Sequence, residues 1–196
     1  MKSYMVASNW KARVAALNQL EEFYRYADSE SALPHVPSLF VVVRDCTKSF
    51  NDLSNFNVAK AMLELFTVIF GIYSKLIRVP DGVLYVPATK LAVEKIGDRK
   101  LYDVSSSCLH SICIAKDPQR VLAVTVKTIV DVKSPLVHVA LLAWFKRFCL
   151  DFGAESLSTG IQDSLLWVLK VRCPEFFTHY YSCGSVTNMT CLDQKF

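Results

Sequence analysis

Cysteine and histidine side chains gather at two places where they could bind a metal ion. The first group is Cys108, His110 and Cys113. The second group lies near the C-terminus and consists of Cys173, His179, Cys183 and Cys191. Zinc modules usually pair their cysteines as C-x2–4-C knuckles, and neither spacing follows that pattern. Cys108 and Cys113 also share an apolar helical face with Leu109 and Ile112, which is typical of core cysteines. We therefore predict no metal site and no cofactor.

Catalytic motifs are missing from the sequence. It contains no G-x-S-x-G nucleophile motif, no glycine-rich phosphate loop and no H-E-x-x-H motif. A Cys–His pair such as Cys149 with His138 could form in space, but no neighbouring residues support one. We predict that the protein is not an enzyme and has no catalytic residues.

Basic residues form the remaining candidate site. The chain has a net charge of +4, and residues 41–150 hold 15 basic and 9 acidic residues. Arg44 ends the apolar run FVVVR, so its charge is expected either to pair with Asp45 or to face a ligand. Lys116, Arg120 and Lys127 lie at or after a helix start, whose free N–H groups favour phosphate. These residues predict a basic surface for an anionic partner that carries phosphate, and the charge pattern adds Lys75 and Arg78 to it. The members of this surface are Arg44, Lys75, Arg78, Lys116, Arg120 and Lys127.

The segment 115–133, AKDPQRVLAVTVKTIVDVK, carries conflicting signals for its secondary structure. Its Val, Thr and Ile residues favour a strand, whereas Asp117-Pro118 is a typical helix start. At about 100° per residue, an apolar arc that includes Val121, Leu122 and Val130 separates from the polar residues. A strand would mix the two kinds of side chain on each face. The periodicity therefore predicts a helix over 117–132, with Arg120 and Lys127 on its solvent side.

The remaining pattern predicts an all-α protein. Residues 38–53 fit a strand or a helix equally well, and Gly97 is expected to end one helix as a left-handed cap. The other predicted helices cover residues 9–26, 57–77, 87–96, 98–115, 135–152 and 160–172. We predict eight or nine helices in two packed helical subdomains. These subdomains are residues 1–97 and residues 98–196, the second ending in a tail after about residue 183.

Hydrophobic residues make up 52% of the chain, but no run of them is suited to crossing a membrane. The most apolar stretch, residues 62–77, contains Glu64 and Lys75 and is short for a membrane span. The first residues lack the apolar core of a signal peptide, and seven cysteines form no disulfide framework. We expect no membrane partner and a place in the cytosol or the nucleus.

The segment IAKDPQRVLAVTVKTIVDVKSPLVHVALLAWFKRF resembles the C-terminal half of the closterovirus RNA silencing suppressors of plant viruses. The shared features are Lys116-Asp117-Pro118, an apolar helix with a basic residue, and a second long helix after a short break. The upstream FVVVRD also has a counterpart in the family, so the resemblance covers residues 38–150. The acidic segment 151–196 has no counterpart there.

The resemblance implies an all-α protein that assembles into a homo-oligomeric ring with a basic inner surface. Such a ring would bind small interfering RNA and microRNA duplexes, with single-stranded RNA as a further ligand, without reading their sequence. It would suppress RNA silencing in the host cell cytoplasm. By position, Arg44 and the Lys116–Lys127 group match basic positions near the RNA surface of the family. The resemblance therefore implies that the basic surface, including Lys75 and Arg78 from the charge pattern, binds RNA.

Two other kinds of protein remain open at this stage. An all-α adaptor that binds a protein and no RNA would fit the high hydrophobic content and the mild charge. A capsid or nucleocapsid subunit would also bind RNA and oligomerise. Binding that weakens steeply with salt would favour phosphate contacts and distinguish RNA binding from the adaptor.

Overall fold

The computed structural model describes residues 9–26, 55–73, 84–153 and 158–172, and these residues form α-helices joined by turns. The helices are α2 (Trp10–Tyr26), α5 (Phe56–Tyr73), α6 (Tyr85–Lys95), α7 (Tyr102–Ala115), α8 (Pro118–Asp131), α9 (Pro135–Phe152) and α10 (Thr159–Arg172). No strand occurs in these ranges, so the all-α prediction is confirmed for them. Each of the seven matches a helix predicted from the sequence, within a few residues at either end.

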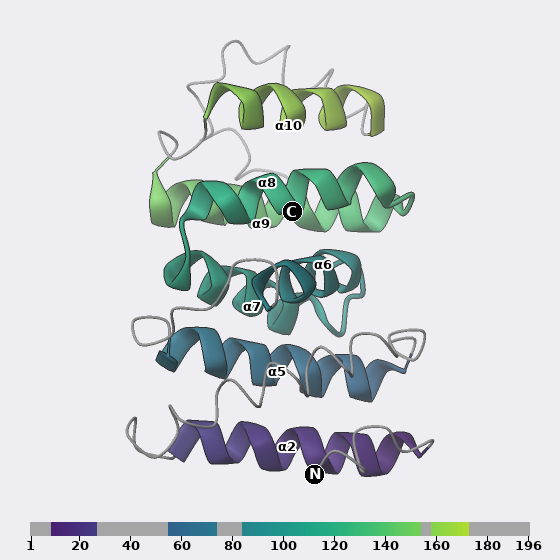
Figure 1. Cartoon of the computed structure of the whole chain (residues 1–196). Helices are drawn as coiled ribbons and strands as arrows, with labels where there is room; N and C mark the ends of the chain where they lie inside the picture. Colours follow the sequence, from purple (N-terminus) through teal and green to yellow (C-terminus); the bar gives the residue numbers. More distant parts are fainter. Residues whose placement is uncertain (1–8, 27–54, 74–83, 154–157, 173–196) are drawn as a thin grey trace.

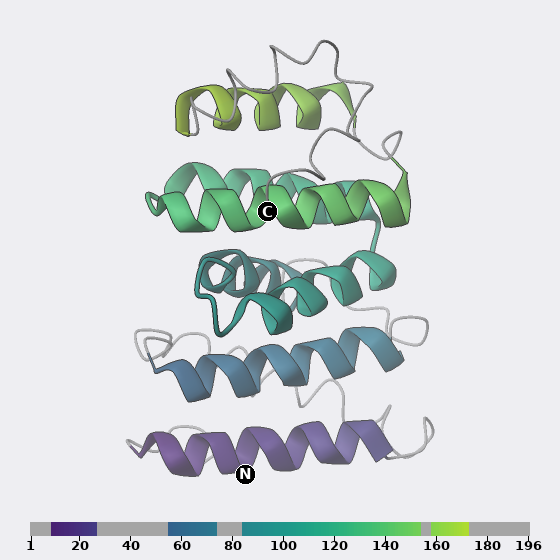
Figure 2. The same ribbon diagram turned by 180° about the vertical axis from the view of Figure 1, so that it is seen from behind.

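The helices are stacked in layers along one axis, in the order of the sequence (Figure 1). α2 and α5 form the first two layers, α6 and α7 the third, α8 and α9 the fourth, and α10 the last. α8 lies in front of α9 in Figure 1, and the opposite view shows α9 in front (Figure 2). Short turns join the two helices within the third layer and within the fourth. This arrangement places residues 96–101 and 132–134 at corresponding positions of adjacent layers.

One hydrophobic core runs through all the layers of the described chain. Helices α2 to α10 each contribute buried side chains to it, for example Leu17, Phe66, Leu91, Leu122 and Trp144. α6 packs against both α7 and α8, so the core continues across residue 97. The division into subdomains at that residue stays a prediction. No helix within the described ranges is long and apolar enough to cross a membrane.

α8 is helical in spite of its β-branched residues, for two physical reasons. The Asp117 carboxylate accepts a hydrogen bond from the Gln119 N–H at 3.0 Å, and Pro118 occupies the first turn. The hydroxyls of Thr125 and Thr128 donate to the carbonyls of Val121 and Val124 at 2.9 and 2.7 Å. These bonds satisfy polar groups that would otherwise be buried without partners.

The faces of α8 follow the predicted pattern with one exception. The apolar face is buried against the other helices, whereas Arg120, Lys127 and Asp131 are exposed. Val130, predicted on the apolar face, is 40% exposed because it lies beside a hollow between α8 and α10.

Gly97 does not act as a left-handed cap, so that prediction is wrong. Among the described glycines, Gly153 at the end of α9 has a positive φ, of 82°, and Gly97 does not. A Cβ atom at residue 97 would lie 2.6 Å from Val137 Cγ2 and 2.8 Å from the Val137 nitrogen. Glycine is needed here because the turn after α6 packs directly against the start of α9.

Candidate interaction surface

The structure describes three of the six predicted RNA-binding residues. Arg44, Lys75 and Arg78 lie outside the described ranges. Lys116 is half-buried at the junction of α7 and α8, where its N–H donates to the Ile112 carbonyl at 2.9 Å. Arg120 is exposed one turn further on. The described half of the predicted site is therefore carried by α8 and the residue before its cap.

The N-terminus of α8 is occupied by its own cap. One oxygen of the Asp117 carboxylate accepts a hydrogen bond from the Gln119 N–H, and the other oxygen lies 4.0 Å from Arg120 Nε. A phosphate at this helix end would meet that negative charge. Any phosphate contact on α8 would therefore depend on the basic side chains and not on the helix N-terminus.

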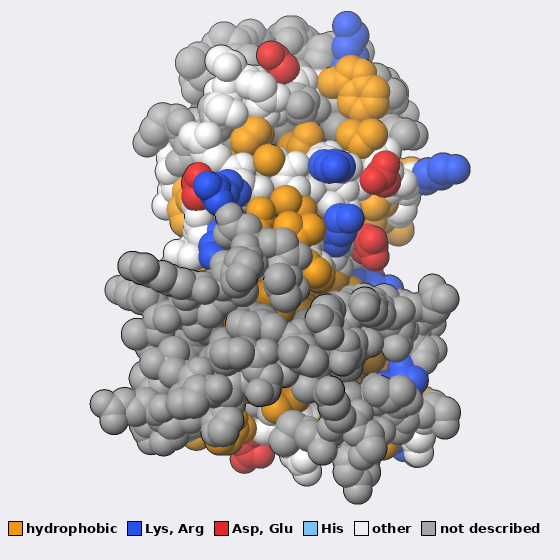
Figure 3. Space-filling view, in the orientation of Figure 1, with side chains coloured by type: hydrophobic (Ala, Val, Ile, Leu, Met, Phe, Trp, Pro, Cys, Tyr) orange, Lys and Arg blue, Asp and Glu red, His pale blue; other side chains and the backbone are white. Residues whose placement is uncertain are grey.

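Lys127 borders a hollow of about 570 Å³ between α8 and α10. The hollow is lined by Ala123, Val126, Lys127, Val130, Gly160, Ile161, Asp163 and Trp167. Asp163 and the half-exposed Trp167 therefore share this surface with Lys127. Around α8 and α10, basic, acidic and hydrophobic side chains are intermixed on the face seen in Figure 3. Lys127 thus belongs to a mixed surface with apolar parts.

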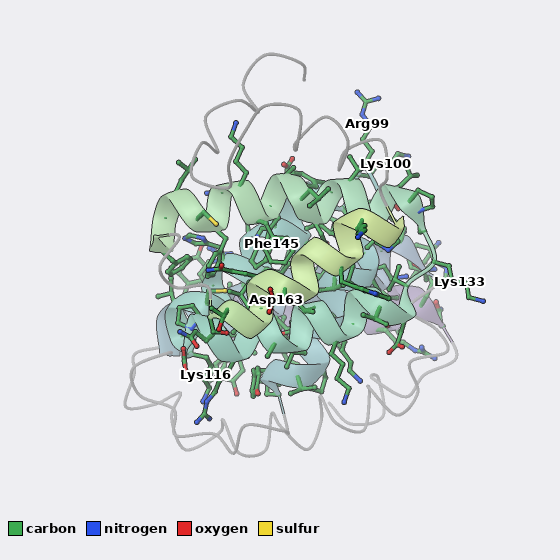
Figure 4. All side chains as sticks on the ribbon, turned by 90° about the horizontal axis from the view of Figure 1, so that it is seen from above. Arg99, Lys100, Lys116, Lys133, Phe145 and Asp163 are labelled. Carbon is green, nitrogen blue, oxygen red and sulfur yellow. The ribbon has the colours of Figure 1, made fainter. Side chains whose placement is uncertain are left out.

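A second group of basic residues lies on the turns that join the paired helices. Arg99 and Lys100 belong to the turn 96–101, and Lys133 belongs to the turn 132–134. All three are exposed, and they lie along one side of the stack, whereas Lys116 is at the opposite corner (Figure 4). We call Arg99, Lys100 and Lys133 the basic edge.

The two turns of the basic edge are held next to each other by packing. Gly97 in the first turn abuts Val137, which lies four residues after Lys133. Within the first turn, Asp98 Oδ1 accepts the Lys100 N–H at 2.9 Å, and the Asp98 carbonyl accepts the Leu101 N–H at 2.9 Å. These bonds close the turn and leave the side chains of Arg99 and Lys100 pointing outward.

The cations of the basic edge have no ion pair with any residue in the described ranges. The nearby acidic residues in sequence are Asp98, whose Oδ1 is bonded to a backbone N–H, Asp103 in the first turn of α7, and Asp131 at the end of α8. Leu136, three residues after Lys133, is 68% exposed. The edge therefore combines exposed positive charge with an exposed apolar side chain.

Sequence reasoning missed this edge, although its residues are visible as single charges. The subdomain boundary predicted after residue 97 falls in the first of the two turns, and Lys133 is one of the many basic residues between positions 41 and 150. The short charged segments between predicted helices were the available signal. Nothing in the sequence indicated that the two segments would be neighbours.

Cys108, Cys113 and His138 are buried in the core, whereas Cys149 is half-buried and His110 is partly exposed, with its Nδ1 3.6 Å from Asp151 Oδ2. Burial raises the pKa of both Cys108 and Cys113 to about 12, so both thiols are neutral at physiological pH. His138 and Cys149 are eleven positions apart on α9, roughly 16 Å along its axis, so they form no pair. No three metal-ligating side chains come together within the described ranges.

Comparison with known proteins shows the fold. No family model matches the sequence, and no curated protein matches it. The structure is similar to the solved structure of TOG3 of Mini spindles from Drosophila melanogaster, with a TM-score of 0.64 and 17% identity. The match covers 92% of this chain and 90% of that chain. The protein therefore has a TOG-like, HEAT-repeat-like all-α fold, and at this identity the similarity extends to the fold alone.

Proposed function

We propose that the protein is an all-α interaction module that binds an acidic surface of a partner protein through the basic edge. The observation that carries the proposal is the placement of Arg99, Lys100 and Lys133 by two packed turns on one side of the stack. Their charges have no ion pair within the described chain and are free to meet carboxylates of a partner.

The architecture supports this proposal. Stacked helical repeats form extended edges, on which corresponding turns of successive repeats present side chains to one partner. Complementary charge speeds encounter and selects partners, while apolar contacts are needed at the centre of a protein interface. The exposed Leu136 beside Lys133 supplies such a contact, and an RNA phosphate backbone would make little use of it.

The proposal is tested with poly-L-glutamate as a model of an acidic protein surface. Replacement of Arg99, Lys100 and Lys133 together by alanine should weaken binding by about tenfold or more and reduce its salt dependence. The matched control replaces Arg120 and Lys127 by alanine and should bind much as the wild type does. Unchanged binding by the triple variant would refute the proposed edge.

A second candidate is the RNA-binding suppressor implied by the resemblance. The specific observation in its favour is the exposure of Arg120 and Lys127 on one face of α8. In this candidate, Arg44, Lys75, Arg78 and Lys116 extend the surface, and a homo-oligomeric ring in the host cell cytoplasm repeats it around one cavity. The whole chain would then form eight or nine helices in two subdomains, residues 1–97 and 98–196.

An RNA duplex of about 21 nucleotides distinguishes the two candidates. Suppressor activity requires salt-dependent duplex binding that is weakened by alanine at Arg120 and Lys127, together with an oligomer in light scattering. A protein that binds poly-L-glutamate through the basic edge and shows no salt-dependent RNA binding would be an interaction module only.

A further inference from the structure

The first turn of α9 contacts both turns of the basic edge. Val137 lies against Gly97 of the turn 96–101, at a distance that leaves no room for a Cβ atom. His138, the next residue, lies with its Nε2 3.0 Å from the Val132 carbonyl oxygen of the turn 132–134. Both side chains are buried, with exposed fractions of 4% and 2%. Val137 and His138 therefore hold both turns against the start of α9.

The bond made by His138 closes the end of α8. Val132 is the C-cap of α8 and has an extended backbone, with φ −83° and ψ 125°. The last carbonyls of a helix have no partner within the helix, and a carbonyl oxygen can only accept. Nε2 of His138 must therefore carry the donated hydrogen. The other ring nitrogen, Nδ1, is buried without a hydrogen-bond partner among the described residues.

We propose that His138 and Gly97 are positioning residues of the basic edge. His138 sets the direction in which Lys133 leaves the turn, and Gly97 lets Arg99 and Lys100 approach it. The role of these residues in partner binding rests on the proposed function, whereas the contacts that join the two turns do not depend on it. A positioning role predicts that the turns are coupled, so that a change in one turn loosens the other. A purely local structural role predicts that each change affects its own turn alone.

Amide hydrogen exchange on the full chain tests the coupling. Leu101 N–H donates to the Asp98 carbonyl, and the N–H of residue 138 donates to the Ser134 carbonyl, so these amides report on the two turns. His138→Asn removes the group at the Nε2 position, and His138→Gln retains a donor near it. The Asn variant should speed exchange at Leu101 about three- to tenfold, and the Gln variant by less than about twofold. Gly97→Ala should likewise speed exchange at residue 138.

Binding of poly-L-glutamate adds a readout on the edge itself. His138→Asn should weaken binding about as much as Lys133→Ala does, while His138→Gln should restore it toward the wild type. If the triple alanine variant of the edge binds normally, the proposed function fails, and the exchange data still decide the positioning roles. Should His138→Asn not fold, Gly97→Ala decides alone. Unchanged exchange at residue 138 in Gly97→Ala, or at Leu101 in His138→Asn, would overturn the inference.

Discussion

The basic edge and the α8–α10 face both carry exposed cations, but they differ in what surrounds each charge. On the face, Arg120 has Asp117 at 4.0 Å, and Lys127 shares a hollow with Asp163 and Trp167. On the edge, Arg99, Lys100 and Lys133 have no ion pair within the described ranges. The face is formed by the exposed sides of two helices, α8 and α10, whereas the edge is assembled from two turns.

This difference shows how close packing between turns can concentrate charge. Side chains three or four residues apart on a helix are neighbours, so a basic residue there can lie close to an acidic one of the same helix, as Arg120 does to Asp117. Turns from different layers have independent sequences, and packing can bring their basic residues together. At the basic edge, the contact between Gly97 and Val137 makes two turns into one surface. The stability of that contact is therefore the first point to test.

The largest expected difference in stability between the two regions comes from replacing one glycine by alanine in each. Gly97→Ala should lower the free energy of unfolding by about 1–3 kcal/mol, because the added Cβ overlaps Val137. Gly160→Ala, on the α8–α10 side, should leave stability unchanged or raise it by up to about 1 kcal/mol, since no atom lies within 4 Å of the new Cβ. Urea denaturation of both variants measures the difference. Equal stability of the two would mean that the edge is not tightly packed.

A smaller effect is expected from removing the polar residue before each of the two proline-initiated helices. Asp117→Ala should cost about 1 kcal/mol, because the Asp117 carboxylate bonds the Gln119 N–H. Ser134→Ala should cost much less, since the Ser134 side chain makes no cap hydrogen bond. Thermal unfolding of the two variants side by side measures the difference. A larger loss for Ser134→Ala would show that the α8–α9 turn depends on that hydroxyl.

The smallest effect on stability is expected from single charge removals in either region. Arg99→Ala and Arg120→Ala should each change the free energy of unfolding by less than about 0.5 kcal/mol, because both side chains are exposed. Their melting temperatures should match the wild type, so that any loss of binding can be assigned to the lost charge. A clear destabilisation by Arg120→Ala would show that its pairing with Asp117 supports the start of α8.

Helix positions were predictable because they depend on local signals. Apolar spacing identified α2 and α5, and Asp117-Pro118 located the start of α8 to within one residue. The end of α6 was located well for a wrong reason, because Gly97 was interpreted as a left-handed cap. Glycine is needed at residue 97 because this residue packs against Val137, forty residues later in the chain. No local sequence pattern indicates a contact between residues so far apart.

The sequence by itself determined that the described chain is helical, which side of α8 is buried, and that Cys108 and Cys113 belong to the core. Each of these follows from the spacing of apolar residues along a single helix, and a side chain's face is decided by its own neighbours. Only the tertiary structure decided that Arg99, Lys100 and Lys133 share one edge and that Lys127 and Asp163 line the same hollow. Those arrangements depend on the order and packing of layers. They arise from contacts between residues distant in the chain, such as Gly97 with Val137 and the residues of α8 with those of α10.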